Sequence, residues 1–206
     1  MSDTGRRAHW DATYSTRSTN SVSWYQSSAT VSLQLIDVAG VDSTDPLVDI
    51  GGGASVLVDD LLDCGFKAIS VLDIAQSALA ATQRRLGDRA AQVNWIVQDV
   101  TRWRPEQPFA LWHDRAAFHF MADETERDSY RKALSHGVQT GGHVIFGTFA
   151  LDGPDRCSGL PVCRYDVESL ASELGVAFSL IRSVEERHHT PGGAMQPFTW
   201  GLFRRL

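Results

Sequence analysis

Three aspartates, each beside the end of a predicted strand, constrain the fold of this chain more than any other feature. Asp49 stands in the run Val48-Asp49-Ile50, directly before Gly51-Gly52-Gly53. Asp73 ends an apolar run roughly 20 residues later, a spacing typical of nucleotide-binding βαβ units, and Asp99 follows the next run. A glycine turn after one strand, with acids after the next two, is typical of a nucleoside site at the carboxyl edge of a parallel sheet.

Apolar runs and helical patterns alternate along the chain, which favours parallel strands joined by crossover helices. Strands are predicted at 47–50, 68–72, 93–97, 109–112 and 143–149, after a first helix that ends at Gly40. Helices are predicted at 55–64, at 77–86 with Ser77 as the N-cap, at 123–136 and at 167–174. Two last runs, 177–186 and 196–204, flank a Pro/Gly loop and predict a hairpin with one antiparallel strand.

Composition excludes several classes of protein. The 206 residues, 43% of them hydrophobic, suit one domain with a real core, and the formal charge of −6 disfavours a nucleic-acid partner. No apolar run approaches the roughly 20 residues that span a bilayer, and no leader pattern is seen, so a cytoplasmic protein without a membrane partner is predicted. Three unevenly spaced cysteines match neither a disulfide framework nor a zinc site, so no metal is predicted.

Charge and spacing at the glycine turn indicate which nucleoside is bound. A dinucleotide fingerprint places a third small residue where this chain has Val56, and no Lys-Ser or Lys-Thr follows the glycines to make a phosphate loop. The carboxylate of Asp49 would repel a diphosphate and attract an ammonium group. The turn therefore favours S-adenosylmethionine, which carries an ammonium and a sulfonium, over an anionic dinucleotide.

The two later acids fit the rest of that donor. Asp73, followed by Ile74, is placed to accept hydrogen bonds from the ribose hydroxyls. Asp99 would accept from the adenine amino group while the backbone N–H of Val100 meets a ring nitrogen. A single aspartate at a strand end is more often a helix cap, but the ordered set with three glycines favours a cofactor site. The predicted cofactor residues are Asp49, Gly51, Gly52, Gly53, Asp73, Ile74, Asp99, Val100 and Trp24, the last as part of an aromatic wall.

From VDIGGG (48–53) through LDIA (72–75) and QDV (98–100) to the terminal hairpin, the chain resembles class I, seven-stranded S-adenosylmethionine-dependent methyltransferases. The resemblance implies an α/β, Rossmann-like three-layer sandwich, with strand order 3-2-1-4-5-7-6, strand 7 antiparallel and an N-terminal helical cap. One domain is expected over 1–206, with the cap segment and first helix at 1–40 and the core at 47–206. In the family the glycine turn contacts the methionine portion of the donor, and the acids matching Asp73 and Asp99 bind ribose and adenine.

The acceptor side is expected in the cap, in the loops after strands 4 and 5, and at the hairpin. The fourth strand is predicted to end before His113 and Asp114, which become the candidates for orienting the acceptor or accepting its proton. The alternative is a structural histidine beside an Asp114–Arg115 pair. Predicted substrate contacts are Tyr14, Tyr25, His119, Arg164 and His189.

Several functions remain open at this point. The preferred one is transfer of a methyl group, by in-line displacement, to a small molecule enclosed by the cap. A protein lysine methyltransferase is the alternative, since His9-Trp10-Asp11, Tyr14 and Trp24-Tyr25 are also similar to an N-terminal pattern of lysine methyltransferases that act on elongation factor and citrate synthase. A catalytically silent nucleoside-binding domain and an NAD-dependent oxidoreductase are less favoured.

Overall fold

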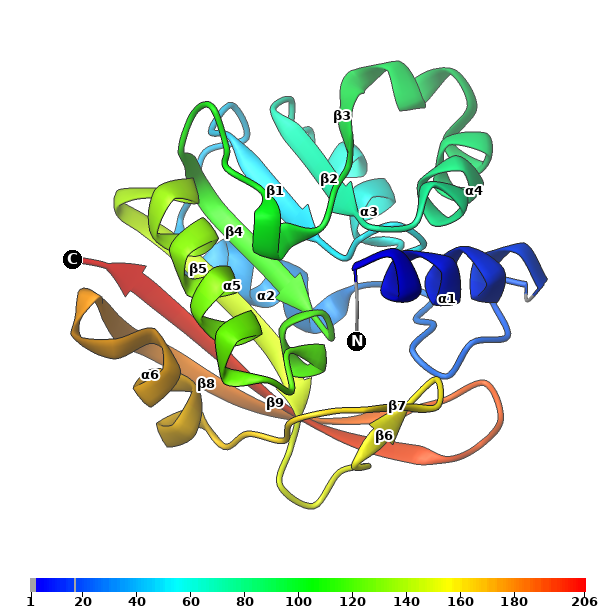
Figure 1. The fold of residues 1–206 in the computed structure, drawn as a ribbon. Coiled ribbons are helices and arrows are strands. Elements are labelled where there is room, and N and C mark those ends of the chain that lie inside the picture. Colours follow the sequence, from blue (N-terminus) through cyan, green and yellow to red (C-terminus); the bar gives the residue numbers. More distant parts are fainter. Residues whose placement is uncertain (1–2, 17) are drawn as a thin grey trace.

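The computed structural model describes residues 3–16 and 18–206, and its centre is a seven-stranded sheet (Figure 1). The strand order is β3-β2-β1-β4-β5-β9-β8. The first five strands run parallel, whereas β9 is antiparallel to both β5 and β8. The predicted strand order and hairpin are therefore confirmed. The strands are β1 (Leu47–Ile50), β2 (Ile69–Asp73), β3 (Val93–Val97), β4 (Phe109–Arg115), β5 (Val138–Phe149), β8 (Phe178–His189) and β9 (Met195–Arg205).

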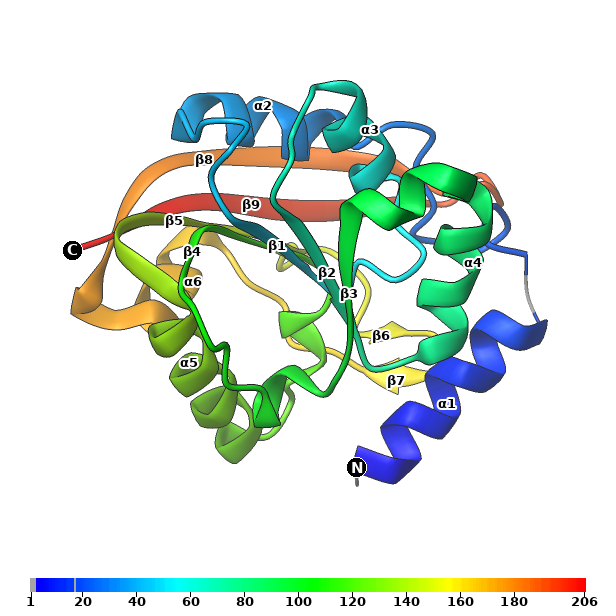
Figure 2. The same cartoon turned by 90° about the horizontal axis from the view of Figure 1, so that it is seen from above.

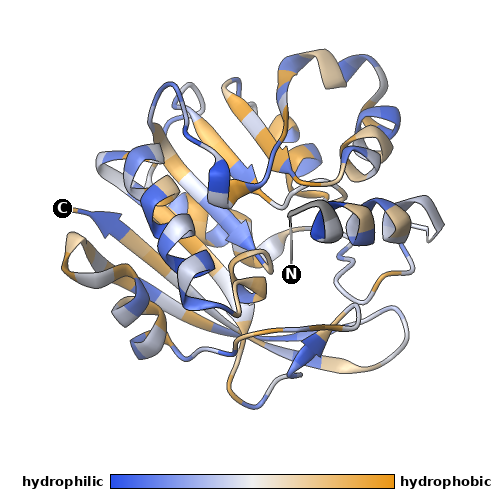
Figure 3. Ribbon diagram, viewed as in Figure 1, coloured by the Kyte–Doolittle hydropathy of each residue, from blue (hydrophilic) through white to orange (hydrophobic). Residues whose placement is uncertain are grey.

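Helices cover both faces of the sheet, which completes the predicted three-layer sandwich. Figure 2 shows α2 (Thr30–Ala39) and α3 (Leu57–Asp63) over one face, and α5 (Glu124–Gly137) and α6 (Val167–Leu174) over the other. Successive side chains of each strand point to opposite faces of the sheet, so an apolar core forms on each face. In β1, Leu47 packs in the core under α2 and α3, while Val48 packs in the core under α5 and α6. Figure 3 shows the hydrophobic colour concentrated along the strands between these layers.

The N-terminal segment forms a helical cap, as expected. Helix α1 (Asp3–Thr16) packs beside α4 (Gln76–Leu86), next to the end of the sheet that carries β2 and β3 (Figures 1 and 2). The backbone N–H and the hydroxyl of Ser77 donate to Asp11 Oδ1 at 3.0 and 2.7 Å. Ser77 was predicted as the N-cap of α4, but Ala75 holds that position and Ser77 instead attaches the cap to the domain.

Two strands extend further than their apolar runs suggest. β4 continues past Trp112 to Arg115, because its residues keep pairing with β1 and β5. His113 pairs in register with Asp49, so the residues predicted to start a loop belong to the strand. β5 begins at Val138 and passes through Gly141 and Gly142, which were predicted to precede it.

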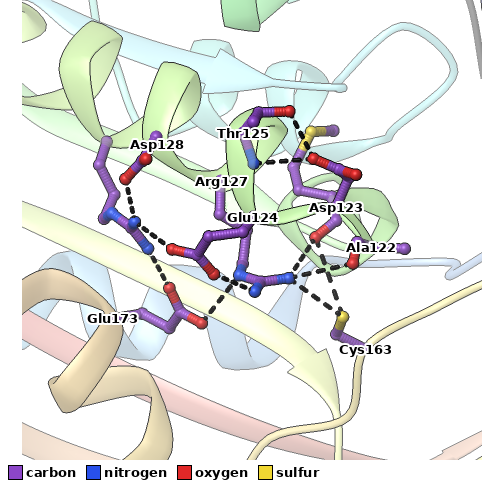
Figure 4. A network of polar contacts seen from close by, with 10 residues as sticks. Ala122, Asp123, Glu124, Thr125, Arg127, Asp128, Cys163 and Glu173 are labelled. Atoms are coloured by element: carbon purple, nitrogen blue, oxygen red, sulfur yellow. Dashed lines mark hydrogen bonds and ion pairs between the residues drawn. The ribbon is translucent and has the colours of Figure 1, made fainter.

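A surface network of charged side chains joins α5 to α6. Arg131 contacts Glu124, Asp128 and Glu173, and Arg127 contacts Glu124 and Glu173 (Figure 4). Exposed pairs of this kind add little stability singly, but the shared partners fix the two helices side by side. Over 3–16 and 18–206, no helix is both long and apolar enough to cross a membrane.

Candidate functional site

A cleft opens at the carboxyl edge of the sheet, where the acids were predicted to meet. It is walled by α1, by the ends of β1 to β4 and by segments that follow β4 and β5. A smaller cavity adjoins it between the glycine turn and the segment after α1, and Tyr14, Trp24, Gly51 and Arg115 line both. Lining residues of the larger cleft include Arg6, Trp10, Ile50, Leu72, Asp73, Ile74, Gln98, Asp99, Val100, Ala117, Phe120, Met121, Phe149, Cys157 and Phe198.

Asp49 lies beneath the glycine turn with one oxygen paired and one free. Its side chain is almost fully buried, and Oδ1 lies 2.7 Å from His113 Nδ1. Oδ2 is buried without a hydrogen-bond partner. A Cβ added to Gly52 would stand 2.1 Å from that oxygen, so only glycine lets the backbone pass over the carboxylate. An unpaired buried carboxylate oxygen is costly to maintain, which makes it a strong acceptor for a cationic ligand.

Asp73 is held at the end of β2 by two backbone donors. The N–H of Gly53 donates to Oδ2 at 3.0 Å, and the N–H of Ala75 donates to Oδ1 at 2.8 Å. A Cβ on Gly53 would lie 2.5 Å from Asp73 Oδ2, so this glycine serves close packing and does not line either cavity. Burial raises the pKa of Asp73 to about 6.

Asp99 follows β3 and serves both as a cap and as part of the cleft wall. Its Oδ1 accepts from the backbone N–H and the hydroxyl of Thr101 at 2.9 and 2.7 Å, which caps the short helix Val100–Arg102. Its Oδ2 lies 3.9 Å from Arg6 Nη1, and Arg6 also contacts Glu126 at 2.5 Å. Asp99 is therefore a helix cap, as aspartates at strand ends often are. Its Oδ2 does not take part in the cap and can accept a hydrogen bond from a ligand in the cleft.

His113 and Asp114 do not face the cleft, which corrects their expected position. The imidazole of His113 lies between Asp49 Oδ1 and Ser32 Oγ, 2.9 Å from Nε2, on the face covered by α2. Asp114 is fully buried on the opposite face, where its carboxylate accepts from the Tyr130 hydroxyl at 2.5 Å and from backbone N–H groups. Burial raises the pKa of Asp114 to about 6. The contacts of His113 match the alternative of a structural histidine, whereas the hydrogen bonds of Asp114 in the described part of the chain do not include Arg115.

The predicted substrate residues divide into two groups. Tyr14 lines both cavities and Tyr25 lines the smaller one. His119, Arg164 and His189 line neither cavity. His119 is buried against Phe149, and burial lowers its pKa to about 3. Arg164 donates to the carbonyl of Gly153, and His189 is exposed near the tip of the β8–β9 hairpin.

Sequence reasoning missed some of the residues that form the walls, among them Phe120 and Arg115. Trp10 packs edge-on against Phe120 and Trp24, and the Trp24 indole donates to the Tyr14 hydroxyl at 3.2 Å. Trp24 was predicted to be part of such a wall. Phe120 and Arg115 were not, because the residues predicted to be functional near the end of β4 were His113 and Asp114. Within the described ranges no group of three or more His, Cys, Asp or Glu side chains is arranged to hold a metal ion.

Comparisons with known proteins agree with this geometry. A family model described as a methyltransferase domain matches residues 47–142. Nodulation protein S of Rhizobium tropici is 28% identical over 82 residues, covering 40% of this chain and 34% of that protein. Malonyl-[acyl-carrier protein] O-methyltransferase 1 of Ilyobacter polytropus is 26% identical over 104 residues, covering 50% of this chain and 37% of that protein. The matches thus span little more than a third of these curated relatives.

Solved structures share the fold at low sequence identity. NodS, an N-methyltransferase of Bradyrhizobium japonicum solved with S-adenosyl-l-homocysteine, has a TM-score of 0.67 at 16% identity, over 85% of this chain and 86% of that one. A structure from work on echinomycin biosynthesis has a TM-score of 0.77 at 15% identity, over 97% and 92%. These likenesses show that the chain shares the Rossmann-like fold of these methyltransferases, and the methyltransferase-domain model matches residues 47–142 of its 206 residues.

Proposed function

We propose that this chain transfers a methyl group from S-adenosylmethionine to a small-molecule acceptor. The observation that carries the proposal is the unpaired, buried Oδ2 of Asp49 beside the glycine turn, next to a cleft that also holds Asp73 and Asp99. A site with this charge suits a cationic amino-acid nucleoside better than a diphosphate. A single domain and a cytoplasmic location belong to the same proposal.

The residues at the cleft fit the donor piece by piece. Asp49 Oδ2 would accept from the ammonium of the methionine portion, Asp73 from the ribose hydroxyls, and Oδ2 of Asp99, which lies 3.9 Å from Arg6 Nη1, from the adenine amino group. The apolar faces of Ile74 and Val100 would flank the adenine ring. S-adenosylmethionine, when bound, supplies a methyl group on a positively charged sulfur.

The protein's contribution to transfer is mainly positioning and exclusion of water. In-line displacement needs the nucleophile, methyl carbon and sulfur collinear, and a well-oriented pair gains a large rate advantage over free reactants. Trp10, Tyr14, Trp24 and Phe120 form an aromatic wall over the cleft. Their rigid rings leave little room for water beside the reacting atoms.

The cleft supplies no obvious general base. Its described titratable lining residues are Arg6, Tyr14, Asp73, Asp99, Arg115 and Cys157, and no histidine is among them. Burial raises the pKa of Tyr14 above its usual range, and Asp73 and Asp99 are assigned to the donor. We therefore expect the acceptor atom to be a thiolate, a carboxylate oxygen or an unprotonated amine when it binds, since none of these has to lose a proton before it attacks the methyl carbon.

The three alternative functions considered from the sequence are less well supported than transfer to a small molecule. The comparisons lend no support to a protein lysine methyltransferase. The 1,6-didemethyltoxoflavin-N1-methyltransferase of Burkholderia thailandensis, solved with 1,6-didemethyltoxoflavin, and the glycopeptide N-methyltransferase MtfA share this fold. An NAD-dependent oxidoreductase is disfavoured by Asp49, whose buried carboxylate would face a diphosphate. A silent binding domain is disfavoured by the presence of all three acids.

Binding of S-adenosylhomocysteine, the demethylated product, should depend on pH through Asp73. Burial holds the pKa of this carboxyl at about 6, so the free protein is increasingly protonated below that value. Because the ribose hydroxyls prefer the ionised form, affinity is full above about pH 6 and falls by up to about tenfold per unit below it. Calorimetry from about pH 7 to about pH 5 measures this, a range in which the ligand's own amino and carboxyl groups titrate little. Unchanged affinity across the range would remove Asp73 from the site.

The acceptor class can be tested without knowing the acceptor. Purified protein and S-adenosylmethionine labelled in the methyl group are added to host lysate, which is then separated into protein and small-molecule fractions. Within the small-molecule fraction the remaining donor is separated by chromatography, and we expect label in a second compound with the wild-type protein and none in that compound with an Asp73→Ala protein. Label confined to protein would reverse the preference for a small acceptor, while the absence of both transfer and donor binding would defeat the proposed activity.

A further inference from the structure

Arg115 carries a buried positive charge that the protein itself leaves partly unsatisfied. It is the last residue of β4, and its guanidinium carbon lies 4.7 Å from the centre of the Phe198 ring. Nη1 donates to the backbone carbonyl of Trp24 at 2.9 Å. Nε and Nη2 are buried and have no hydrogen-bond partner. Burying charged donors without partners is costly, so such an arrangement points to a ligand that completes it.

The neighbouring carboxylates do not neutralise Arg115. Among the described residues no carboxylate oxygen lies within the 4.0 Å of an ion pair with it. Burial lowers the pKa of Arg115 to about 10, and the charge of Glu186 opposes this shift only in part. Both Glu186 oxygens accept from other side chains, Gln26 at 3.1 Å and Trp200 at 2.8 Å. Asp114, the adjacent acid, points to the opposite face of the sheet.

The two unpaired nitrogens are the pair that matches a carboxylate. In a planar guanidinium, Nε–H and one N–H of Nη2 point in the same direction from one edge, and this fork binds both oxygens of a carboxylate with two parallel hydrogen bonds. Around it the cleft is apolar and aromatic, lined by Phe120, Phe149, Phe198 and the thiol of Cys157. That surface fits the flat or apolar body of a small molecule.

We infer that the acceptor is a small apolar or aromatic molecule that bears a carboxylate, and that Arg115 binds this carboxylate through Nε and Nη2. The inference rests on the proposed function. It makes Arg115 the residue that selects anionic acceptors over neutral ones, because the neutral analogue would leave the buried donors unpaired.

The position of the guanidinium indicates that Arg115 binds the carboxylate of the acceptor and not the carboxylate of the donor. The side chain borders both cavities, but its charged end stacks on Phe198, which lines only the larger cleft, as does Cys157. The methionine portion is assigned to the smaller cavity, which is lined by Asp49 and Gly52. The guanidinium is therefore positioned beside the acceptor end of the cleft.

Benzoate and benzamide, matched in shape and different in charge, are suitable probes. Their dissociation constants would be measured by calorimetry on the full chain saturated with S-adenosylhomocysteine. We expect benzoate to bind more tightly by about tenfold to a hundredfold, as a charge-assisted bidentate contact provides. Arg115→Gln should abolish the difference by weakening benzoate alone, and Arg115→Lys should retain only part of it, since an ammonium cannot form the fork. Arg164→Gln, on an arginine outside both cavities, is the matched control and should change neither constant.

The outcomes are distinct. Equal affinity for the two probes, or a benzoate preference that survives in Arg115→Gln, overturns the inference while leaving methyl-donor binding intact. A loss of S-adenosylhomocysteine affinity in both Arg115 variants, with affinity for 5′-methylthioadenosine retained, would reassign Arg115 to the donor carboxylate and also overturn it. Failure of the wild-type protein to bind S-adenosylhomocysteine at all would instead defeat the proposed function.

Discussion

Asp73→Ala is expected to weaken S-adenosylhomocysteine binding by about a hundredfold or more. The substitution removes two charge-assisted hydrogen bonds to the ribose, each contributing roughly 1.5 to 3 kcal/mol, where about 1.4 kcal/mol corresponds to tenfold in affinity. It also leaves the N–H groups of Gly53 and Ala75 without their acceptor, which loosens the glycine turn itself. Isothermal titration calorimetry on the purified variant gives the result directly.

Two further variants show whether the loss is specific. Asp88→Ala removes an exposed aspartate just after α4, away from both cavities, and should bind like the wild type. Asp73→Asn keeps one acceptor oxygen of the same shape and should fall between wild type and Asp73→Ala. Comparable affinity in all four proteins would mean that the ribose lies elsewhere.

Asp114→Ala is expected to lower the free energy of unfolding by about 3 to 5 kcal/mol, because it orphans several buried donors at once. The carboxylate accepts from the N–H of Ala117 at 2.9 Å, from Phe118 at 3.0 Å and from the Tyr130 hydroxyl at 2.5 Å. The Tyr130 hydroxyl in turn accepts from the Trp112 indole at 2.9 Å. Loss of the Asp114 carboxylate therefore also disturbs the packing of Tyr130 and Trp112 in the core under α5. Urea unfolding followed by tryptophan fluorescence measures the change.

Asp114→Asn distinguishes a structural role from the acid–base role first expected of this residue. Its amide oxygen can still accept from the two backbone N–H groups, so it should lose less stability than Asp114→Ala, and the folded protein should keep the pH dependence of turnover. A fully stable Asp114→Asn protein whose turnover has lost one pH-dependent limb would restore the acid–base role.

Most of the fold was predictable because its signals are local. The helix stop at Gly40, the strand at Leu47–Ile50 and the helix at Val167–Leu174 each follow from a short run of sequence, and each is found where expected. The end of β4 was not predicted correctly, because the length of this strand is set by its pairing with β1 and β5. Without that pairing, the polar run His113-Asp114-Arg115 resembles a loop.

The donor half of the candidate site was more accessible to sequence reasoning than the acceptor half. Asp49, Asp73 and Asp99 follow successive parallel strands, so topology alone brings them to one edge. The walls of the acceptor half come from Trp10, Arg115 and Phe198, which lie far apart in the chain, and no spacing rule connects them. The direction of the Arg115 side chain depends on the register of β4 and on the ring of Phe198 in β9.

The position of β9 between β5 and β8 also fixes an order of assembly. β5 and β8 do not pair with each other, and β9, which follows both in sequence, joins them through pairs such as His143 with Arg204. Contacts of such long sequence separation form late and slowly. Phe198, which supports the Arg115 guanidinium, lies on β9. A chain that grows from its N-terminus therefore contains the three acids of the donor-binding edge before it contains Phe198, and the aromatic chamber beside them is complete only when β9 has been made.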